Sequence, residues 1–127
     1  MRHIWIVDDD EDMNRAIELM LKILDCEVTT FHNARSVVQT LLTGKRPELL
    51  LLDINMPEVS GLDVLEFLRR RPEWKELPII MLSSDAAESM VDKALEMGAD
   101  SYLMKPVTIE ELEKAMVTAI QKRVSVK

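Results

Sequence analysis

Residues 48–57 read Glu-Leu-Leu-Leu-Leu-Asp-Ile-Asn-Met-Pro, and this stretch decides the fold. Its run of leucines is bounded by charged residues at Glu48 and Asp53, so it is far too short to cross a bilayer. A short apolar run without polar alternation is typical of a strand buried on both faces, as in a parallel sheet covered by helices. We therefore expect a strand from Glu48 to Leu52, with Asp53 at its carboxyl end.

Four further apolar runs share the short length and the sharp boundaries of the first one. They lie at His3 to Val7, Glu27 to Phe31, Pro78 to Leu82 and Ser101 to Met104. Between the runs, apolar residues recur at intervals of three and four, which is the period of an amphipathic helix. These helical stripes cover residues 13–24, 37–42, 62–68, 90–97 and 109–120. The alternation predicts five βα units with strands that are apolar throughout.

Local signals at the helix ends agree with this division. Gly44 and Gly98 suit helix C-termini, where a left-handed backbone favours glycine. Short, right-handed βα connections leave few arrangements, so we expect an α/β fold: a doubly wound three-layer sandwich around a five-stranded parallel sheet. Two residue pairs have the spacing of a capping box, namely Asp85 with Glu88 and Thr108 with Glu111.

Composition limits the classes of protein that need to be considered. The 127 residues are 47% hydrophobic and 31% charged, which is typical of one globular domain over residues 1–127 and excludes a disordered or membrane-spanning chain. A formal charge of −7 disfavours direct binding of nucleic acid by this domain. The single cysteine, Cys26, is expected in the core, and the N-terminus lacks a secretory pattern, so we expect a cytoplasmic protein.

Four of the five apolar runs end in side chains that can bind or react. This matters because ligands bind outside the carboxyl ends of the strands in an open α/β sheet. The exception is the second run, which ends at Phe31 and His32 with no acid or amine, as expected of a strand at the sheet edge. The other runs are followed by Asp8 and Asp9, by Asp53, by Ser83 and Ser84, and by Lys105 and Pro106.

We expect these groups to converge because parallel strands end at the same edge of a sheet. Clustered carboxylates without histidine or an available cysteine make an all-oxygen site, which suits Mg²⁺ rather than zinc. One carboxylate then remains free as a nucleophile, while Lys105 and Ser83 bind a phosphoryl group. The acidic run from Asp8 to Asp12 has a second interpretation, because acids also favour a solvated helix start.

Five segments in order resemble the receiver domain of bacterial two-component response regulators, and the resemblance covers essentially the whole chain. It implies a flavodoxin-like (βα)5 sandwich with the strand order 2-1-3-4-5 and a function in phosphorelay signal transduction. The segments are Val7-Asp8-Asp9, Leu-Leu-Leu-Leu-Asp53-Ile-Asn55-Met56-Pro57 followed by Gly61, Met-Leu-Ser83-Ser84, Gly98-Ala99, and Tyr102-Leu-Met-Lys105-Pro106.

The resemblance also implies roles for individual residues in the reaction. Asp53 becomes the phosphoacceptor, which takes its phosphoryl group from a sensor histidine kinase or a phosphotransfer protein. Asp9 becomes a direct Mg²⁺ ligand and Asp8 acts through water, while the main-chain carbonyl of Asn55 is a further ligand beside Asp53. Lys105 becomes the phosphate-binding lysine. Such a protein catalyses its own phosphorylation and dephosphorylation and is not a classical turnover enzyme.

A second set of implied roles concerns the output. Ser83 takes the place of the switch Thr or Ser, and Tyr102 that of the rotating aromatic residue. Pro106 resembles a proline that follows a cis peptide bond after Lys105. The fourth helix, fifth strand and fifth helix then form the surface that changes, which a partner domain or a second copy in a homodimer would recognise. The resemblance implies no partner in a membrane.

Some residues depart from the family pattern. Asp10 adds a third acid beside the pair, and we expect it to act as an N-terminal helix cap. Val107 stands where many receivers have Phe, which makes that contact smaller. His3 and His32 match no receiver chemistry, so we expect them at the surface or at the sheet edge.

Three alternative functions remain. A flavodoxin shares the architecture, but it binds flavin phosphate in a hydroxyl- and glycine-rich loop after its first strand, where this chain has an acidic loop. A haloacid-dehalogenase-type phosphatase resembles Asp-x-Asp after the first strand, whereas Asp53-Ile-Asn55 follows the third. A degenerate receiver would only bind partners, although the complete set of acids, hydroxyl and lysine disfavours it.

Overall fold

Strands and helices alternate along the described part of the chain. The computed structural model describes residues 2–84 and 88–125. Within them, the strands are β1 (Arg2–Val7), β2 (Cys26–Phe31), β3 (Leu49–Asp53), β4 (Ile79–Ser83) and β5 (Ser101–Met104). The helices are α1 (Glu11–Ile23), α2 (Ala34–Leu42), α3 (Gly61–Arg69), α4 (Glu88–Glu96) and α5 (Ile109–Ser125). None of these helices is long and apolar enough to cross a membrane.

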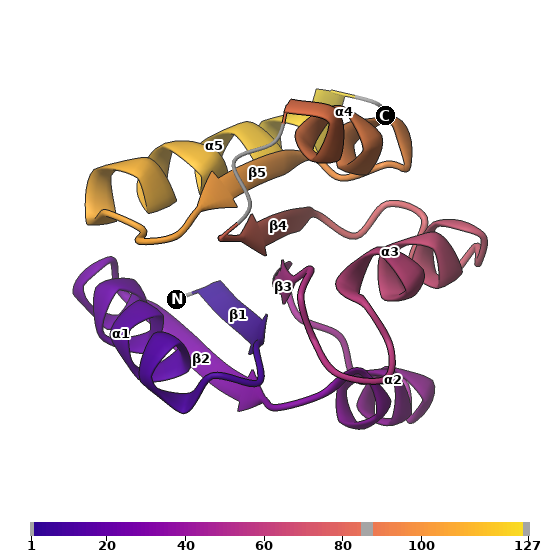
Figure 1. Ribbon diagram of the computed structural model, residues 1–127, viewed down its shortest axis with the longest axis horizontal. Coiled ribbons are helices and arrows are strands. Elements are labelled where there is room, and N and C mark those ends of the chain that lie inside the picture. The colour runs from indigo at the N-terminus through magenta and orange to yellow at the C-terminus, as the bar shows by residue number, and fades with distance from the viewer. Residues whose placement is uncertain (1, 85–87, 126–127) are drawn as a thin grey trace.

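The five strands form one parallel sheet in the order β2-β1-β3-β4-β5 (Figure 1). This confirms the doubly wound fold and the strand order that the family resemblance implied. The strand ends differ by one residue from the sequence-based expectation. Asp53 and Ser83 are the last residues of β3 and β4, paired with Leu82 and Met104 on the neighbouring strands, so both lie within the sheet.

The edge strands differ in a way that the sequence pattern did not show. β2 lies at one edge, as predicted, but it is not apolar throughout. Its middle residues from Val28 to Thr30 are only half-buried. A strand without a neighbour on one side has less cover, so polar residues are tolerated there. β5 forms the other edge, yet Lys105 follows it. The absence of a reactive end residue therefore does not distinguish the two edges.

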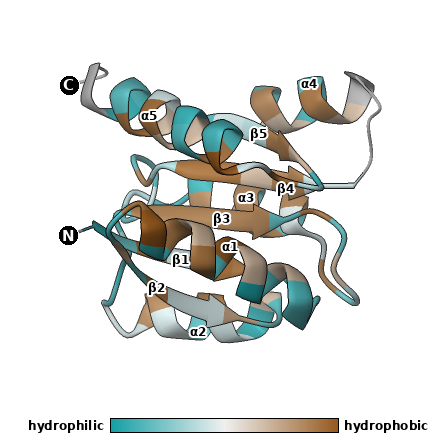
Figure 2. Cartoon of the chain, turned by 90° about the vertical axis from the view of Figure 1, so that its left-hand side faces the viewer, coloured by the Kyte–Doolittle hydropathy of each residue, from teal (hydrophilic) through white to brown (hydrophobic). Residues whose placement is uncertain are grey.

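Helices cover both faces of the sheet and divide the core in two. Side chains alternate between faces along each strand. One cluster combines Ile4, Ile6, Leu49, Leu51, Ile80 and Leu82 with residues of α1 and α5. The other cluster lies under α2, α3 and α4 (Figures 1 and 2). The continuous apolar runs of β1, β3 and β4 thus serve both faces, as the leucine run of β3 predicted.

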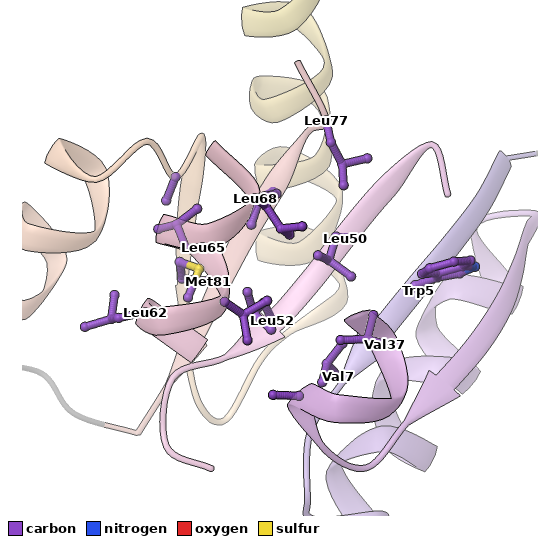
Figure 3. Close-up of a cluster of buried hydrophobic side chains, with 14 of the residues drawn as sticks. Trp5, Val7, Val37, Leu50, Leu52, Leu62, Leu65, Leu68, Leu77 and Met81 are labelled. Carbon is purple, nitrogen blue, oxygen red and sulfur yellow. The ribbon is translucent and has the colours of Figure 1, made fainter. Parts of the chain in front are cut away.

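The cluster under α2, α3 and α4 is shown in Figure 3. Leu50 and Leu52 of β3 lie next to Leu65 and Leu68 of α3, and Trp5 of β1 lies on the side of Val37. All six are at most 4% exposed. Full burial of one such side chain stabilises the fold by roughly 1.5–3 kcal/mol. This packing holds β3, and with it Asp53, in the middle of the sheet.

The helix ends carry the capping groups that the sequence indicated. Asp10 is the N-cap of α1, as predicted, and its Oδ1 accepts hydrogen bonds from the Asp12 and Met13 amides. Thr108 and Glu111 bond each other in the predicted capping box. The other predicted box involves Asp85, which lies outside the described residues. Positive φ angles of 98° and 110° occur at the two glycines expected at helix ends, Gly44 and Gly98.

A buried ion cluster stabilises the end of the sheet opposite to the reactive side chains. Asp100, 3% exposed, precedes β5 and accepts hydrogen bonds from Arg69 Nη2 (3.0 Å), Arg123 Nε (2.8 Å) and the Ile79 amide (3.0 Å). Arg69 lies at the end of α3 and Arg123 near the end of α5. One carboxylate therefore ties two helices on opposite faces to the start of β4.

Candidate functional site

Three carboxylates meet at the carboxyl ends of β1 and β3. Asp8 and Asp9 follow β1, and Asp53 ends β3. Each offers an oxygen atom, and these oxygens all lie within 4.8 Å of one another. Asp8 and Asp53 are 0% and 1% exposed, whereas Asp9 is exposed. The convergence expected from the strand ends is therefore present for all three acids.

A tight turn after β1 holds Asp8. Its amide donates to the carbonyl of Phe31 at the end of β2 (3.1 Å), and its Oδ1 accepts from the Asp10 amide (2.9 Å). Asp10 then begins α1 as its N-cap. The acidic run thus serves two purposes, because its first two acids face the cluster and Asp10 caps the helix.

The loop after β3 closes tightly on Asp53. The Gly61 amide donates to the carbonyl of Ile54 (3.0 Å), which brings the start of α3 against the end of β3. A Cβ atom on Gly61 would lie 2.0 Å from the main-chain oxygen of Asp53, so only glycine fits there. The Asn55 amide lies 3.4 Å from Asp53 Oδ1, at the long limit of a hydrogen bond.

Lys105 reaches into the acidic cluster from the loop after β5. Its Nζ lies 2.8 Å from Asp8 Oδ2 and 3.2 Å from Asp53 Oδ1. The Lys105 amide donates to the carbonyl of Ser83 (2.9 Å), and the Lys105–Pro106 peptide bond is cis. The ammonium group thus bridges the two buried carboxylates. Sequence reasoning reserved Lys105 for a phosphoryl group and did not foresee this direct pairing.

The electrostatics of the cluster raise two pKa values. Burial, followed by the negative charge of Asp8, raises the pKa of Asp53 from 3.8 to about 6, although Lys105 opposes the shift. For Lys105, burial lowers the pKa, but the hydrogen bond to Asp8 and the charges of both carboxylates outweigh it and the net pKa is raised. Lys105 therefore stays protonated at neutral pH. The Asp53 carboxyl group is ionised there, but its negative charge costs free energy in this buried position.

Ser83 and Tyr102 lie on the neighbouring strands β4 and β5. Ser83 is completely buried at the end of β4. Tyr102 is half-buried in β5, opposite Met81 of β4, and packs against the cluster under α2, α3 and α4. Tyr102 thus lies on the outermost strand, next to the strand that ends in Ser83.

The donor set fits a hard divalent cation. The clustered ligand atoms of Asp8, Asp9 and Asp53 are all carboxylate oxygens, and no histidine or cysteine belongs to this group among the described residues. Such oxygens are the ligands that Mg²⁺ prefers, usually with one or two carboxylates and several waters. The exposure of Asp9 leaves one side of the cluster open to solvent.

Sequence reasoning missed one residue next to this site. Asn14 of α1 is 3% exposed, and its Nδ2 donates to the main-chain oxygen of Asp8 (2.8 Å). The signal was available, because Asn14 is a polar residue in line with Ile17 and Leu21 on the apolar face of α1. His3 lies in β1, where its ring contacts Thr29 of the edge strand β2, and His32 is exposed.

Proteins with related sequences match nearly the whole chain. Protein RcaC of Microchaete diplosiphon is 34% identical over 94% of this chain, and the phosphate regulon transcriptional regulatory protein PhoB of Rhizobium meliloti is 37% identical over 94%. The match covers only 18% of RcaC and 52% of PhoB. The two-component response regulator ORR3 of Oryza sativa is 28% identical over 94% of this chain and 92% of its own length.

Solved structures and a family model agree with these relatives. The Vibrio cholerae chemotaxis protein CheY4 superposes with a TM-score of 0.83 at 25% identity, over 92% of this chain and 97% of that one. The Mn²⁺-bound form of response regulator Rcp1 superposes with a TM-score of 0.78 at 27% identity, over 96% and 93%. The model of the response regulator receiver domain matches residues 4–117. The chain therefore belongs to the receiver domain family of two-component response regulators, a family of phosphorelay signalling and not of turnover enzymes.

Proposed function

We propose that residues 1–127 act as one receiver unit and that Asp53 is its phosphoacceptor. The observation that carries the proposal is the position of Lys105, whose ammonium group lies between Asp8 Oδ2 and Asp53 Oδ1. The two buried acids differ in which oxygens are engaged: Asp8 contacts Lys105 through Oδ2 and the Asp10 amide through Oδ1, whereas Asp53 contacts both Lys105 and the Asn55 amide through Oδ1. Asp9 is exposed and lacks the lysine contact.

The reaction transfers a phosphoryl group from a phosphohistidine of a sensor kinase or a phosphotransfer protein. A carboxylate oxygen of Asp53 forms a bond to phosphorus as the phosphorus–nitrogen bond breaks, and the imidazole leaves with that electron pair. Lys105 moves from the two carboxylates to the incoming phosphoryl oxygens, and the Ser83 hydroxyl donates a hydrogen bond to them. The chain itself then governs both phosphorylation and the later hydrolysis of the acyl phosphate.

Asp8, Asp9, Asp53 and the main-chain carbonyl of Asn55 would hold Mg²⁺ in this reaction. The ion supplies positive charge that offsets the carboxylates and the phosphoryl oxygens. The oxygen-only donor set and the open side of the cluster at Asp9 support this choice of metal. RcaC and PhoB extend well beyond the match, so an attached output domain is the partner class that best fits a chain of this kind.

The output follows from the packing beside the site. A phosphoryl group on Asp53 attracts the Ser83 hydroxyl, the loop after β4 shifts, and Tyr102 fills the space that opens. The changed surface is formed by α4, β5 and α5, and a partner domain or a second copy of the chain binds it in the cytoplasm. The half-buried position of Tyr102 against the core supports this path, because the ring is neither locked inside nor free in solvent.

Mass spectrometry tests the phosphoacceptor. Incubation with acetyl phosphate and Mg²⁺ should add one phosphoryl group to the wild type and to Glu58→Gln, an exposed acid in the loop after β3. Asp53→Asn should add none, and chelation of Mg²⁺ should suppress the addition. An adduct trapped by borohydride on Asp8 or Asp9 would overturn the assignment. Turnover of external phosphoesters would instead favour the phosphatase alternative.

Nuclear magnetic resonance tests the output path. Beryllofluoride, a mimic of the phosphoryl group, should shift amide signals in the site and also between Met90 and Tyr102. In Ser83→Ala the distant shifts should be lost while those in the site remain. Shifts confined to the site in the wild type would contradict the coupling.

A further inference from the structure

Asn14 is a buried polar residue whose position is not explained by the chemistry proposed above. It is 3% exposed and lies with Ile17 and Leu21 on the face of α1 that packs against the sheet. Its Oδ1 is buried and lacks a hydrogen-bond partner within the described part of the chain. An unpaired buried acceptor carries a desolvation cost. The unpaired Oδ1 adds no stability, so the role of Asn14 must come from its donors.

Those donors hold both ends of the turn that contains Asp9. The side-chain Nδ2 of Asn14 donates to the main-chain oxygen of Asp8 at 2.8 Å. The backbone amide of Asn14 donates to the main-chain oxygen of Asp10 at 3.0 Å. The same Nδ2 atom lies 3.5 Å from His32 Nδ1, a long contact that links Asn14 to the loop after β2. The bond to the Asp10 carbonyl is the first main-chain bond of α1, so only the bond to the Asp8 carbonyl depends on the Asn14 side chain.

Asp9 depends on this support because its own carboxylate has none. Its side chain is exposed, and no described residue forms a hydrogen bond or ion pair with it. Its oxygen nevertheless lies within 4.8 Å of oxygens of Asp8 and Asp53. With no partner for the side chain, the backbone of residues 8–10 sets where that carboxylate points.

We propose that Asn14 is a positioning residue for metal binding. Its side-chain N–H group holds the carbonyl of Asp8, next to the first main-chain bond of α1, and the Asp9 carboxylate stays turned toward the other two acids. This inference rests on the metal site of the proposed function. It concerns the hydrogen bond to the Asp8 carbonyl and does not make Asn14 a metal ligand.

Binding of Mn²⁺, a spectroscopic substitute for Mg²⁺, tests the role separately from activity. Titration followed by the paramagnetic resonance of free Mn²⁺ gives the dissociation constant. Asn14→Leu should raise it about tenfold, which is the effect typical of removing a residue that orients a ligand. The urea midpoint of Asn14→Leu should stay close to that of the wild type, because removal of the unpaired Oδ1 offsets the loss of the hydrogen bond to the Asp8 carbonyl. Asn14→Ala should weaken Mn²⁺ binding to the same extent.

Ile17→Val is the matched control, since it loses one methyl group from the same face of α1. It should lower the urea midpoint and leave the Mn²⁺ affinity unchanged. Folded Asn14→Leu and Asn14→Ala proteins with wild-type affinity would overturn the inference, as would the failure of both to fold. Asp9→Asn separates the two proposals. If it binds Mn²⁺ as tightly as the wild type does, the proposed metal site fails as well.

Discussion

Replacement of Asp53 by Asn should stabilise the metal-free protein at neutral pH. The carboxyl group has a pKa of about 6 in the fold against an ordinary value of 3.8, first because of burial and then because of Asp8. A group whose pKa is raised on folding contributes its stability below the unfolded pKa and loses it as the pH rises through the folded value. The wild type should therefore lose stability between about pH 4 and about pH 6.

The size of the effect follows from the shift. Roughly two pKa units at about 1.4 kcal/mol per unit give an upper limit of ~3 kcal/mol. Solvent that reaches the open side of the cluster screens the charges, so we expect about 1–2 kcal/mol. Asn has the shape of Asp and no charge, and Lys105 keeps its contact with Asp8 at 2.8 Å. Asp53→Asn should thus gain this amount at neutral pH and almost nothing near pH 4.

Urea unfolding in the presence of a chelator, followed by circular dichroism at both pH values, measures the difference. The slope of the unfolding free energy against urea should be the same for both proteins. Glu58→Gln, which removes an exposed acid outside the cluster, should change neither value. A neutral-pH midpoint for Asp53→Asn equal to or below that of the wild type would refute the reasoning. A gain of equal size at both pH values would refute its electrostatic origin.

Four further perturbations test the same region. Lys105→Met leaves two buried carboxylates without their cation, so the free energy of unfolding at neutral pH should fall by about 3 kcal/mol. Acid should restore the stability, and an unchanged thermal midpoint would argue against the pairing. Gly61→Ala places a Cβ atom 2.0 Å from the Asp53 carbonyl and should cost about 3 kcal/mol in urea unfolding, whereas wild-type stability would show that the loop yields. Glu58 has a φ of 70°, so Glu58→Gly should gain up to about 1 kcal/mol while Glu58→Ala gains nothing. Mg²⁺ should raise the melting temperature of the wild type more than that of Asp9→Asn, and equal shifts would place the ion elsewhere.

The sheet and its order of layers were predictable because burial in a parallel sheet leaves a strong pattern. A leucine run such as that of β3 is stable only when both faces are covered, and the helical stripes show what covers them. The same logic brought Asp8, Asp53 and Lys105 together, since strand ends on one edge are neighbours. The sequence showed the polar residues in the middle of β2 but not how far they are buried, because that depends on the missing neighbour at the edge.

Contacts between side chains distant in sequence were the part that could not be predicted. Whether Lys105 pairs with two carboxylates depends on its reach and on the charges already buried there, and neither leaves a periodic signal. The cluster of Arg69, Asp100 and Arg123 joins residues from three segments and has no local signature. Asn14 was detectable in principle, because a polar residue on a buried helical stripe needs a partner.

The net charge of Lys105 and the carboxylates around it also bears on the order in which the cation and the phosphoryl donor of the proposed reaction bind. Three carboxylates and one ammonium group leave the site with two uncompensated negative charges near neutral pH. A phosphoryl donor is itself an anion and is repelled by that charge, whereas a divalent cation is attracted and cancels it. In the proposed reaction this charge favours binding of the cation before the donor, and the fraction of molecules ready to react should rise with the free Mg²⁺ concentration.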